Sequence, residues 1–243
     1  MPKNENDWRM QNFGFVAEDT FLPAVNQIAK KGSQITFRSI AQLNKRKLVS
    51  IVLPNATALC INSSKRSWEE AEKIRKLSKI DSSLKKEVVF SSTADSFDYL
   101  ERVMESVIMA YTALEAFANE NIPDGYEYHC NKKSEIILEI MDKKAIERWL
   151  SLDEKLSIVL PSARNIESPK GKKCWQGFKD LKATRNRIVH MKGEDRRSSG
   201  PEIPTLWHKL LKSSAPYIQA KDMIGYFVKE TGEVPRWYSE YPK

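Results

Sequence analysis

A short run late in the chain, Arg185-Asn186-Arg187-Ile188-Val189-His190, carries the residue types that metal-free cleavage of RNA requires. In that reaction the 2′-hydroxyl attacks the adjacent phosphorus, so a side chain that exchanges protons near neutral pH must take part, and His190 fits this role. Arg185 can stabilise the charge that builds on the phosphoryl oxygens, and Asn186 can orient the histidine or the phosphate. The run is also compatible with an ordinary helix end, at which the histidine meets the last carbonyls and the arginines are solvated.

The spacing within this run suits one helix. Asn186 and His190 are four residues apart and therefore share a face, whereas Arg185 lies about 140° around the helix from His190. A long guanidinium can still reach across that arc. Apolar residues between Lys172 and Met191 predict that the helix is anchored in a core by one face, made of Trp175, Phe178, Leu181 and Ile188.

The elements that must hold this helix also read as helices. Apolar residues spaced by three or four predict a long helix over 93–121, which Pro123-Asp124-Gly125 stops. Shorter helices are expected at about 134–150 and 152–160, the second ending at Leu160-Pro161. A last helix is expected from Thr205 to about Lys229, with a break or kink at Pro216.

The first ninety residues are expected to be helical as well. Their apolar residues suggest one helix around Phe21, Val25, Ile28 and Ala29 and a second around Ile40, Leu43, Leu48, Ile51 and Val52. A third helix, over 67–79, begins with a capping-box pattern. Strand signals are weak, since 86–90 and 226–228 could both be helix ends. We therefore expect an all-α bundle with a helical N-terminal extension.

Composition favours a cytoplasmic protein that meets a polyanion. The longest apolar runs are far shorter than the ~20 residues of a membrane span, the N-terminus lacks a secretory segment, and the three cysteines suggest reduced thiols. Net charge is +8, and two regions are strongly basic: 30–90, with 14 Lys/Arg against 5 Asp/Glu, and 170–197, with 10 against 3. Such regions attract nucleic acid, although Lys-rich faces are often only solvated. The three histidines have no ligand spacing, so we expect no metal and no cofactor.

The motif resembles the HEPN superfamily, whose hallmark is an Arg, often followed by Asn, and a nearby His at the end of a late helix. The stretch 111–119 resembles the early long helix of that family, and 149–156 with Leu160-Pro161 resembles a connecting region of some bacterial members. The resemblance covers roughly 90–230. It implies a helical N-terminal extension of unknown role over 1–90, a HEPN-like domain over 91–230 and a C-terminal tail over 231–243.

The resemblance also implies a function. Active members are metal-independent endoribonucleases of toxin–antitoxin, phage-defence, CRISPR and RNA-processing systems, usually symmetric dimers in which two motif helices form one composite cleft. By motif match, Arg185 and His190 are the catalytic pair and Asn186 supports them. The resemblance also implies, more weakly, that Glu115 and Asn119 support the site, although the two could equally be a surface pair or a helix-packing contact.

Further residues are expected to contact RNA through charge alone. Arg187 could bind a phosphate or be solvated, and the same alternatives hold for the lysines around the motif helix, namely Lys170, Lys172, Lys173, Lys182 and Lys192. RNA, a second copy of the chain and an antitoxin are the expected partners. Two other interpretations stay open: a catalytically inactive HEPN-like domain that binds RNA or a protein, and a helical interaction module in which the motif is a coincidence.

Overall fold

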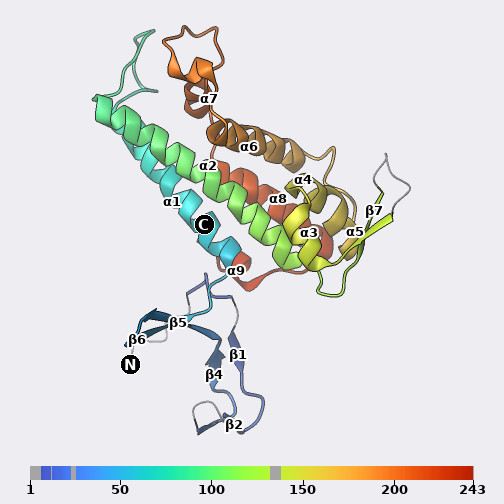
Figure 1. Ribbon diagram of the computed structural model, residues 1–243. Coiled ribbons are helices and arrows are strands. Elements are labelled where there is room, and N and C mark those ends of the chain that lie inside the picture. Colours follow the sequence, from blue (N-terminus) through green and yellow to red (C-terminus); the bar gives the residue numbers. More distant parts are fainter. Residues whose placement is uncertain (1–6, 12, 23–25, 132–137, 243) are drawn as a thin grey trace. The chain divides into compact units, whose positions relative to one another are not determined.

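The computed structural model describes residues 7–11, 13–22, 26–131 and 138–242, which form two compact units (Figure 1). The N-terminal unit comprises the residues up to Leu59 and those from Val234 onward, and the helical unit comprises Cys60–Glu233. Helix α1 (Ala56–Leu77) begins in the first unit and continues into the second. The division therefore falls near residue 60 and not at residue 90, and the expected C-terminal tail belongs to the N-terminal unit.

Helix α2 (Thr93–Asn121) is the long central element of the helical unit and confirms the helix predicted over 93–121. The hydroxyl of Ser92 caps it by accepting from the Asp95 N–H at 3.0 Å, and the backbone becomes extended at Ile122, next to Pro123. Its apolar stripe is buried along most of its length, at Tyr99, Val103, Val107, Ala110, Ala113, Leu114, Phe117 and Ala118.

Three later helices pack on α2. Helix α6 (Lys173–Val189), the predicted motif helix, contacts both α2 and α8 (Pro216–Thr231), and α7 (Leu206–Leu211) contacts α2 and α6. Pro216 separates α7 from α8, as its fixed φ and missing N–H predict. The side chains that anchor these helices are Phe178, Leu181, Leu206, Leu210, Met223, Ile224 and Phe227.

The segment before α6 differs from its prediction. Helix α3 (Lys143–Trp149) is followed by α4 (Leu152–Glu154), a π-helical turn η1 (Lys155–Val159) and α5 (Leu160–Arg164), so the chain stays helical through Pro161. The proline leaves the Ser157 carbonyl without its usual donor, and the Ser168 hydroxyl donates to that carbonyl at 2.8 Å instead. A side-chain donor thus replaces the lost backbone bond, and the expected stop at Leu160-Pro161 is wrong.

The helix predicted over 134–150 is only half right. Strands β7 (Tyr128–Asn131) and β8 (Leu138–Met141) pair antiparallel, and only the part from Lys143 onward is helical. Residues 132–137 lie outside the described residues. A short apolar run does not distinguish a buried helix from a strand, and here the Asp142 side chain caps the helix late by accepting from the Ala145 N–H.

The N-terminal unit is built from strands, so the prediction of an all-α chain with a helical N-terminal extension is wrong there. Strand β1 (Phe13–Phe15) pairs with β4 (Gln34–Thr36), β2 (Thr20–Leu22) with β3 (Gln27–Ala29), and β5 (Arg38–Asn44) with β6 (Lys47–Val52), all antiparallel. These pairs replace the two helices expected around Phe21 and Ile40; Val25, part of the first, lies outside the described residues.

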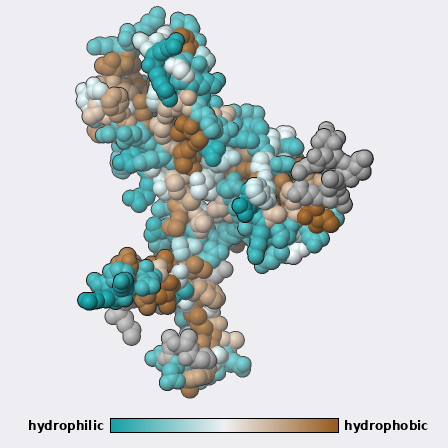
Figure 2. All heavy atoms as spheres, in the orientation of Figure 1, coloured by the Kyte–Doolittle hydropathy of each residue, from teal (hydrophilic) through white to brown (hydrophobic). Residues whose placement is uncertain are grey.

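Turn chemistry explains the β5–β6 hairpin. The Asn44 side chain accepts from the Arg46 N–H at 3.0 Å, which closes the chain into an Asx-type turn. Both faces of the hairpin carry exposed apolar side chains, among them Ile40, Leu48 and Ile51. Figure 2 shows this brown, apolar surface over the strands of the N-terminal unit. Because apolar residues lie on both faces, the period-two alternation that usually reveals a strand is missing.

The last residues complete the N-terminal unit. Helix α9 (Arg236–Ser239) places the Arg236 guanidinium 4.4 Å above the ring of Phe13, and the rings of Trp8 and Tyr241 meet edge to face at 5.1 Å. The two ends of the chain therefore share one small core.

The cysteines and the hydrophobic character of the helices were both considered in the sequence. All three cysteines are free. No helix among the described residues has the length and apolar character needed to cross a membrane.

One buried carboxylate joins the end of α6 to α7. The side chain of Asp195, in the 3-10 turn η2 (Gly193–Arg196), is fully buried and accepts from Arg187 Nη2 at 2.8 Å, the Lys192 N–H at 2.8 Å and the Leu206 N–H at 2.7 Å. Burial on its own raises the pKa of Asp195, but the two backbone hydrogen bonds and the charge of Arg187 outweigh it and leave the pKa below its ordinary value.

We predict that Asp195→Ala lowers the free energy of unfolding by about 2 kcal/mol at pH 7, because buried donors on three segments lose their acceptor. Since the folded pKa lies below the unfolded one, this stabilisation is complete above the unfolded pKa and is lost as pH falls through the folded pKa. Urea unfolding from pH 7 down to acid pH should therefore show the variant and the wild type converging below about pH 4.

Glu194→Ala is the matched control, because Glu194 bonds the same arginine at 2.8 Å from an exposed position. Its loss should change stability by less than about 1 kcal/mol. Equal losses in the two variants would contradict the assigned role of Asp195.

Candidate functional site

The predicted motif lies at the C-terminal end of α6, which ends at Val189. Phe178, Leu181 and Thr184 are buried and hold the helix in the core, while Arg185 and Asn186 are half-buried on its flank. His190 follows as the C-cap residue with non-helical φ and ψ, and its N–H donates to the Asn186 carbonyl at 2.9 Å. The helix therefore presents the motif at an end that its own core residues fix.

Arg185 and Asn186 are in direct contact. Arg185 Nη1 donates to Asn186 Oδ1 at 3.0 Å, and the guanidinium carbon lies 4.9 Å above the ring of Tyr111 on α2. Burial raises the pKa of the Tyr111 phenol, the charge of Glu115 adds to this, and the charge of Arg185 opposes it. Tyr111 thus keeps its neutral ring under the arginine, where a cation–π contact orients the guanidinium.

His190 stands apart from this pair. Its side chain is exposed, and no side chain among the described residues hydrogen-bonds its imidazole. Five residues separate it from Arg185, which corresponds to about 7 Å along a helix axis. Within one chain the structure brings Arg185 and Asn186 together and leaves the His190 imidazole free to meet a ligand.

The flank of α2 that faces Arg185 is polar. Glu115 lies one turn after Tyr111, and its carboxylate forms an ion pair with Lys155 of η1. Lys155 is fully buried, whereas 36% of the Glu115 side chain is exposed. Lys155 also donates to the Glu147 carbonyl at 2.9 Å. The π-helical turn therefore carries a buried cation that holds Glu115 in place.

A second carboxylate neutralises the lysines of α6. Asp153 forms ion pairs with Lys182 and, at 2.9 Å, with Lys179. Burial on its own raises the pKa of Asp153, but the hydrogen bonds from both lysines outweigh it, so the pKa lies below its ordinary value. Lys182, one of the expected RNA contacts, is thus committed to a carboxylate within the chain.

Charge balance then distinguishes Arg185 from its neighbours. Lys155, Lys179 and Lys182 each have a carboxylate partner, whereas Arg185 makes no ion pair within the described residues. Its positive charge is held half-buried over an aromatic ring, with an amide as its hydrogen-bond partner. A guanidinium in this state is suited to receive an external anion, and its planar donors match a phosphate.

Asn119, the other residue expected to support the site, is one turn beyond Glu115 on α2. Its Oδ1 is buried and accepts no hydrogen bond from the described residues. Asn119 therefore continues the polar flank of α2, and its Oδ1 forms no hydrogen bond with Arg185, Asn186 or His190.

Arg187 belongs to a different surface. Two residues correspond to about 200° around a helix, so Arg187 lies on the opposite flank of α6 from Arg185. Its Nη2 bonds Glu194 and Asp195, both at 2.8 Å. The structure thus uses this motif arginine to join α6 to η2 and separates it from the candidate site.

The remaining lysines are dispersed. Lys172 pairs with Glu167 at 3.4 Å, and Lys170, Lys173 and Lys192 are exposed. Lys170, Lys172 and Lys173 lie just before or at the N-terminal end of α6, remote along the helix from His190. Lys192 lies two residues after His190. Of the expected RNA-binding lysines, Lys192 is therefore the one that accompanies the motif.

Lys155 and Asp153 were not among the site residues predicted from the sequence. A signal for Lys155 existed, because it falls at an apolar position of the series Leu152, Lys155, Leu156, Val159 and should therefore point into the core. A buried lysine needs a counter-charge, so a carboxylate on a neighbouring helix could have been expected. The sequence could not show that Glu115 is the partner of Lys155, because the register between α2 and η1 decides which carboxylate meets the lysine.

Among the described residues, no three His, Cys, Asp or Glu side chains lie close enough together to hold a metal ion.

We predict that Glu115→Ala lowers the free energy of unfolding by about 3 kcal/mol, because it leaves the Lys155 ammonium buried without a counter-charge. Lys155→Met removes the buried charge itself and should cost less. Urea unfolding of both variants tests this order. A larger loss in Lys155→Met than in Glu115→Ala would show that the ion pair does not govern stability here.

We compared the chain with protein-family models, with curated proteins and with solved structures. None of the three comparisons finds a match.

Proposed function

We propose that this chain is a metal-independent endoribonuclease of the HEPN type. The observation that carries the proposal is the state of Arg185: half-buried, stacked on Tyr111, bonded to Asn186 and without a carboxylate partner among the described residues. An exposed histidine, His190, follows at the same end of α6. A fixed cation and a proton-exchanging imidazole at the same helix end are two groups that metal-free phosphoryl transfer requires.

The proposed reaction is transesterification followed by release of the 3′ fragment. The ribose 2′-oxygen bonds to the adjacent phosphorus as it loses its proton, the bond from phosphorus to the 5′-oxygen breaks, and that oxygen gains a proton. The products are a 2′,3′-cyclic phosphate and a 5′-hydroxyl. His190 transfers a proton, Arg185 stabilises the extra charge on the phosphoryl oxygens, and Asn186 orients the guanidinium.

The charge distribution supports an RNA substrate. From Thr20 to Trp68 the sequence contains no Asp or Glu, while it contains eight Lys/Arg. In the β5–β6 hairpin the basic residues are Arg38, Lys45, Arg46 and Lys47. A phosphate backbone is attracted to such a segment irrespective of its base sequence.

A groove beside the motif supports the proposal of a symmetric dimer. It has a volume of about 1110 Å³ and lies between α1, α2 and Ile188 of α6. Its apolar residues include Met104, Ile108 and Ile188, and its rim carries both signs of charge, with Arg66, Glu69, Glu70, Glu101, Arg102 and Glu105. A surface with both charges can be complementary to itself, as a two-fold interface requires. Dimerisation here would bring two motif helices close together.

The family resemblance suggests the setting, a bacterial toxin or phage-defence nuclease with a protein antagonist. The alternative function is an RNA-binding domain without catalysis. It is favoured by one observation: among the described residues, the His190 imidazole forms no hydrogen bond with the side chains of Arg185 and Asn186. The two functions differ in a single measurable step, the breaking of the phosphodiester bond.

We predict that the purified chain cleaves RNA in the presence of EDTA and leaves 2′,3′-cyclic phosphate ends. Arg185→Ala and His190→Ala should each reduce the rate by about 100-fold or more, since each removes stabilisation or proton transfer from the transition state. Gel analysis of end-labelled RNAs of varied sequence, with chemical identification of the ends, provides the measurement.

Two variants serve as matched controls. His129→Ala removes an exposed histidine away from the motif, and Arg197→Ala removes an exposed arginine that follows it, so both should retain wild-type activity. Circular dichroism verifies the fold of every variant. Equal cleavage by His190→Ala and the wild type, or intact RNA after incubation with a well-folded wild type, would overturn the nuclease; RNA binding in the second case would favour the alternative.

We predict further that the chain sediments as a dimer and that Ile108→Glu reduces its mass to that of a monomer, because a charge in the groove is desolvated without a partner. Val89→Glu introduces the same charge at an exposed position outside the groove and should leave the mass unchanged. Analytical ultracentrifugation measures both. A monomeric wild type, or a dimeric Ile108→Glu variant, would argue against this interface.

A further inference from the structure

The β5–β6 hairpin of the N-terminal unit has two unlike faces, because successive side chains of a strand point to opposite sides. Val49 of β6 lies opposite Ala41 of β5. Two residues further along β6, Ile51 lies opposite Ser39, so both pairs point to the same side of the hairpin. This side therefore combines small residues on β5 with β-branched apolar residues on β6.

The same face extends by one pair beyond the two strands. The Leu53 N–H donates to the Phe37 carbonyl at 2.8 Å, which continues the register. The large apolar side chains of this face are all exposed. We call the whole set the apolar face; its members are Phe37, Ser39, Ala41, Val49, Ile51 and Leu53. Exposed and contiguous apolar surface of this kind marks a site of interaction.

The opposite face of the hairpin is polar in part. Arg38 and Ser50 lie on it, and Arg38 Nε donates to Ser50 Oγ at 2.7 Å. Ile40 and Leu48 are its exposed apolar residues. Because the guanidinium and the hydroxyl interrupt this surface, the apolar face is the side of the hairpin that offers apolar side chains without a charge between them.

Positive charge lies at the turn, next to the apolar face. The turn carries Lys45, Arg46 and Lys47, and the alternation along β6 places Lys47 on the same side as the apolar face. None of the three forms an ion pair with a carboxylate of the described residues. From Thr20 to Trp68 the sequence contains no Asp or Glu. The apolar face therefore has a cationic border.

A bilayer with anionic lipid matches this arrangement better than RNA, a second copy or another protein does. RNA attracts the basic residues through its phosphates, but Val49, Ile51 and Leu53 offer its bases no ring to stack on. A second copy brings the same positive charge and no counter-charge. A protein partner needs shape complementarity, whereas acyl chains accept apolar side chains of any arrangement. A bilayer combines those chains with anionic headgroups in one layer.

We propose that the apolar face docks on the surface of a bilayer that contains anionic lipid. Its side chains enter the boundary between headgroups and acyl chains, and Lys45, Arg46 and Lys47 lie among the headgroups. The hairpin stays shallow, because the N–H and C=O groups at the open edges of a two-stranded sheet cannot enter hydrocarbon. The proposal does not depend on the nuclease, since the hairpin and the motif belong to different units.

Sedimentation of the full chain with vesicles tests the proposal. Wild type should bind vesicles of phosphatidylcholine with phosphatidylserine much more tightly than vesicles of phosphatidylcholine alone. The double change Val49→Thr and Ile51→Thr keeps β-branched side chains in the strand and should weaken binding at least about tenfold, because apolar transfer energy is lost. The matched control is Ile40→Thr with Leu48→Thr, which makes the same kind of change on the opposite face and should bind like the wild type.

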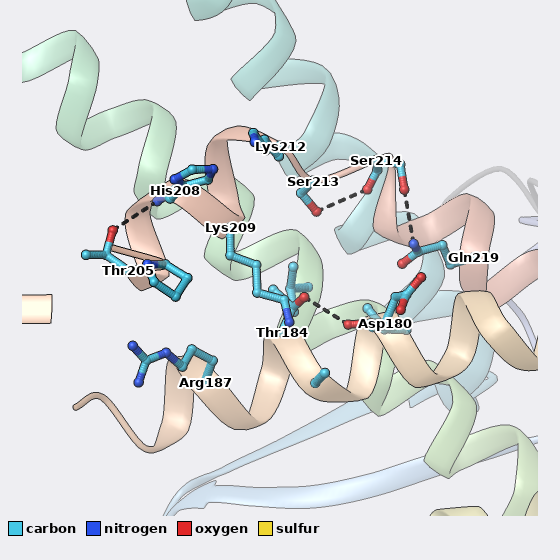
Figure 3. A pocket seen from close by; sticks show the side chains of 14 residues that line it. Asp180, Thr184, Arg187, Thr205, His208, Lys209, Lys212, Ser213, Ser214 and Gln219 are labelled. Carbon is cyan, nitrogen blue, oxygen red and sulfur yellow. Dashed lines mark hydrogen bonds between the residues drawn. The ribbon is translucent and has the colours of Figure 1, made fainter. Parts of the chain in front are cut away.

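The contribution of charge is measured in the same assay. Lys45→Gln with Lys47→Gln should weaken binding at least about tenfold, and added salt should weaken binding of the wild type. Lys209→Gln with Lys212→Gln removes the same charge from two exposed lysines of the helical unit, which Figure 3 shows on and just after α7. This control should not change the binding of vesicles.

Circular dichroism verifies the fold of each variant. A folded wild type that binds no vesicles, equal binding to the two kinds of vesicle, or equal losses in the two threonine variants would overturn the proposal. Binding of RNA without binding of vesicles would also overturn it, as would a dimer that only the Val49 and Ile51 changes dissociate while vesicles stay unbound. RNA cleavage by the same variants reports on the nuclease separately, so failure of one proposal is distinguished from failure of the other.

Discussion

The helical unit depends on the packing of one face of α2. The stripe from Val103 to Phe117 is buried against α6, α7 and α8, and the rings of Phe117 and Phe227 lie 5.8 Å apart in that contact. Because the stripe covers only part of the circumference, the flank beside it remains free for polar residues. Tyr111 and Glu115 occupy that flank, so the packing that stabilises the unit also sets the distance between the polar side chains of α2 and the end of α6.

Charge pairing gives the two flanks of α6 different chemistry. On one flank Asp153 pairs with Lys179 and Lys182, and Glu115 pairs with Lys155. Arg185, which lies over Tyr111, forms no ion pair with a carboxylate of the described residues. On the other flank Arg187 is paired with Glu194 and Asp195, and its buried Nη1 has no acceptor in the part of the chain that the structure describes. Two arginines separated by one residue therefore serve separate surfaces, because a helix turns by about 200° between them.

The N-terminal unit is stabilised differently from the helical unit. Its strands are short, they pair only two at a time, and the β5–β6 hairpin exposes apolar side chains on both faces. Isolated two-stranded pairs are marginal in water. The unit gains further stability from contacts between the two ends of the chain, through Arg236 with Phe13 and Trp8 with Tyr241. Residues 20–59 of this unit contain Lys and Arg but no Asp or Glu.

The sequence by itself determined the long helix α2 and the position of the motif, whereas α1 begins at Ala56 and not at the predicted residue 67. The spacing of apolar residues defined α2, and Pro216 separated α7 from α8, because burial of a stripe and the covalent geometry of proline act locally. The motif could be placed at the end of α6 for the same reason. Only the tertiary structure decided the pairing of Lys155 with Glu115, the contact of Arg185 with Tyr111 and the opposite placement of Arg187. It also decided that 38–52 forms a hairpin. The apolar residues of this segment fit the period of a helix as well as that of a strand, and the pairing of β5 with β6, closed by the turn at Asn44, gives the strand. Contacts between segments far apart in the chain depend on helix register, which no local pattern of residues encodes.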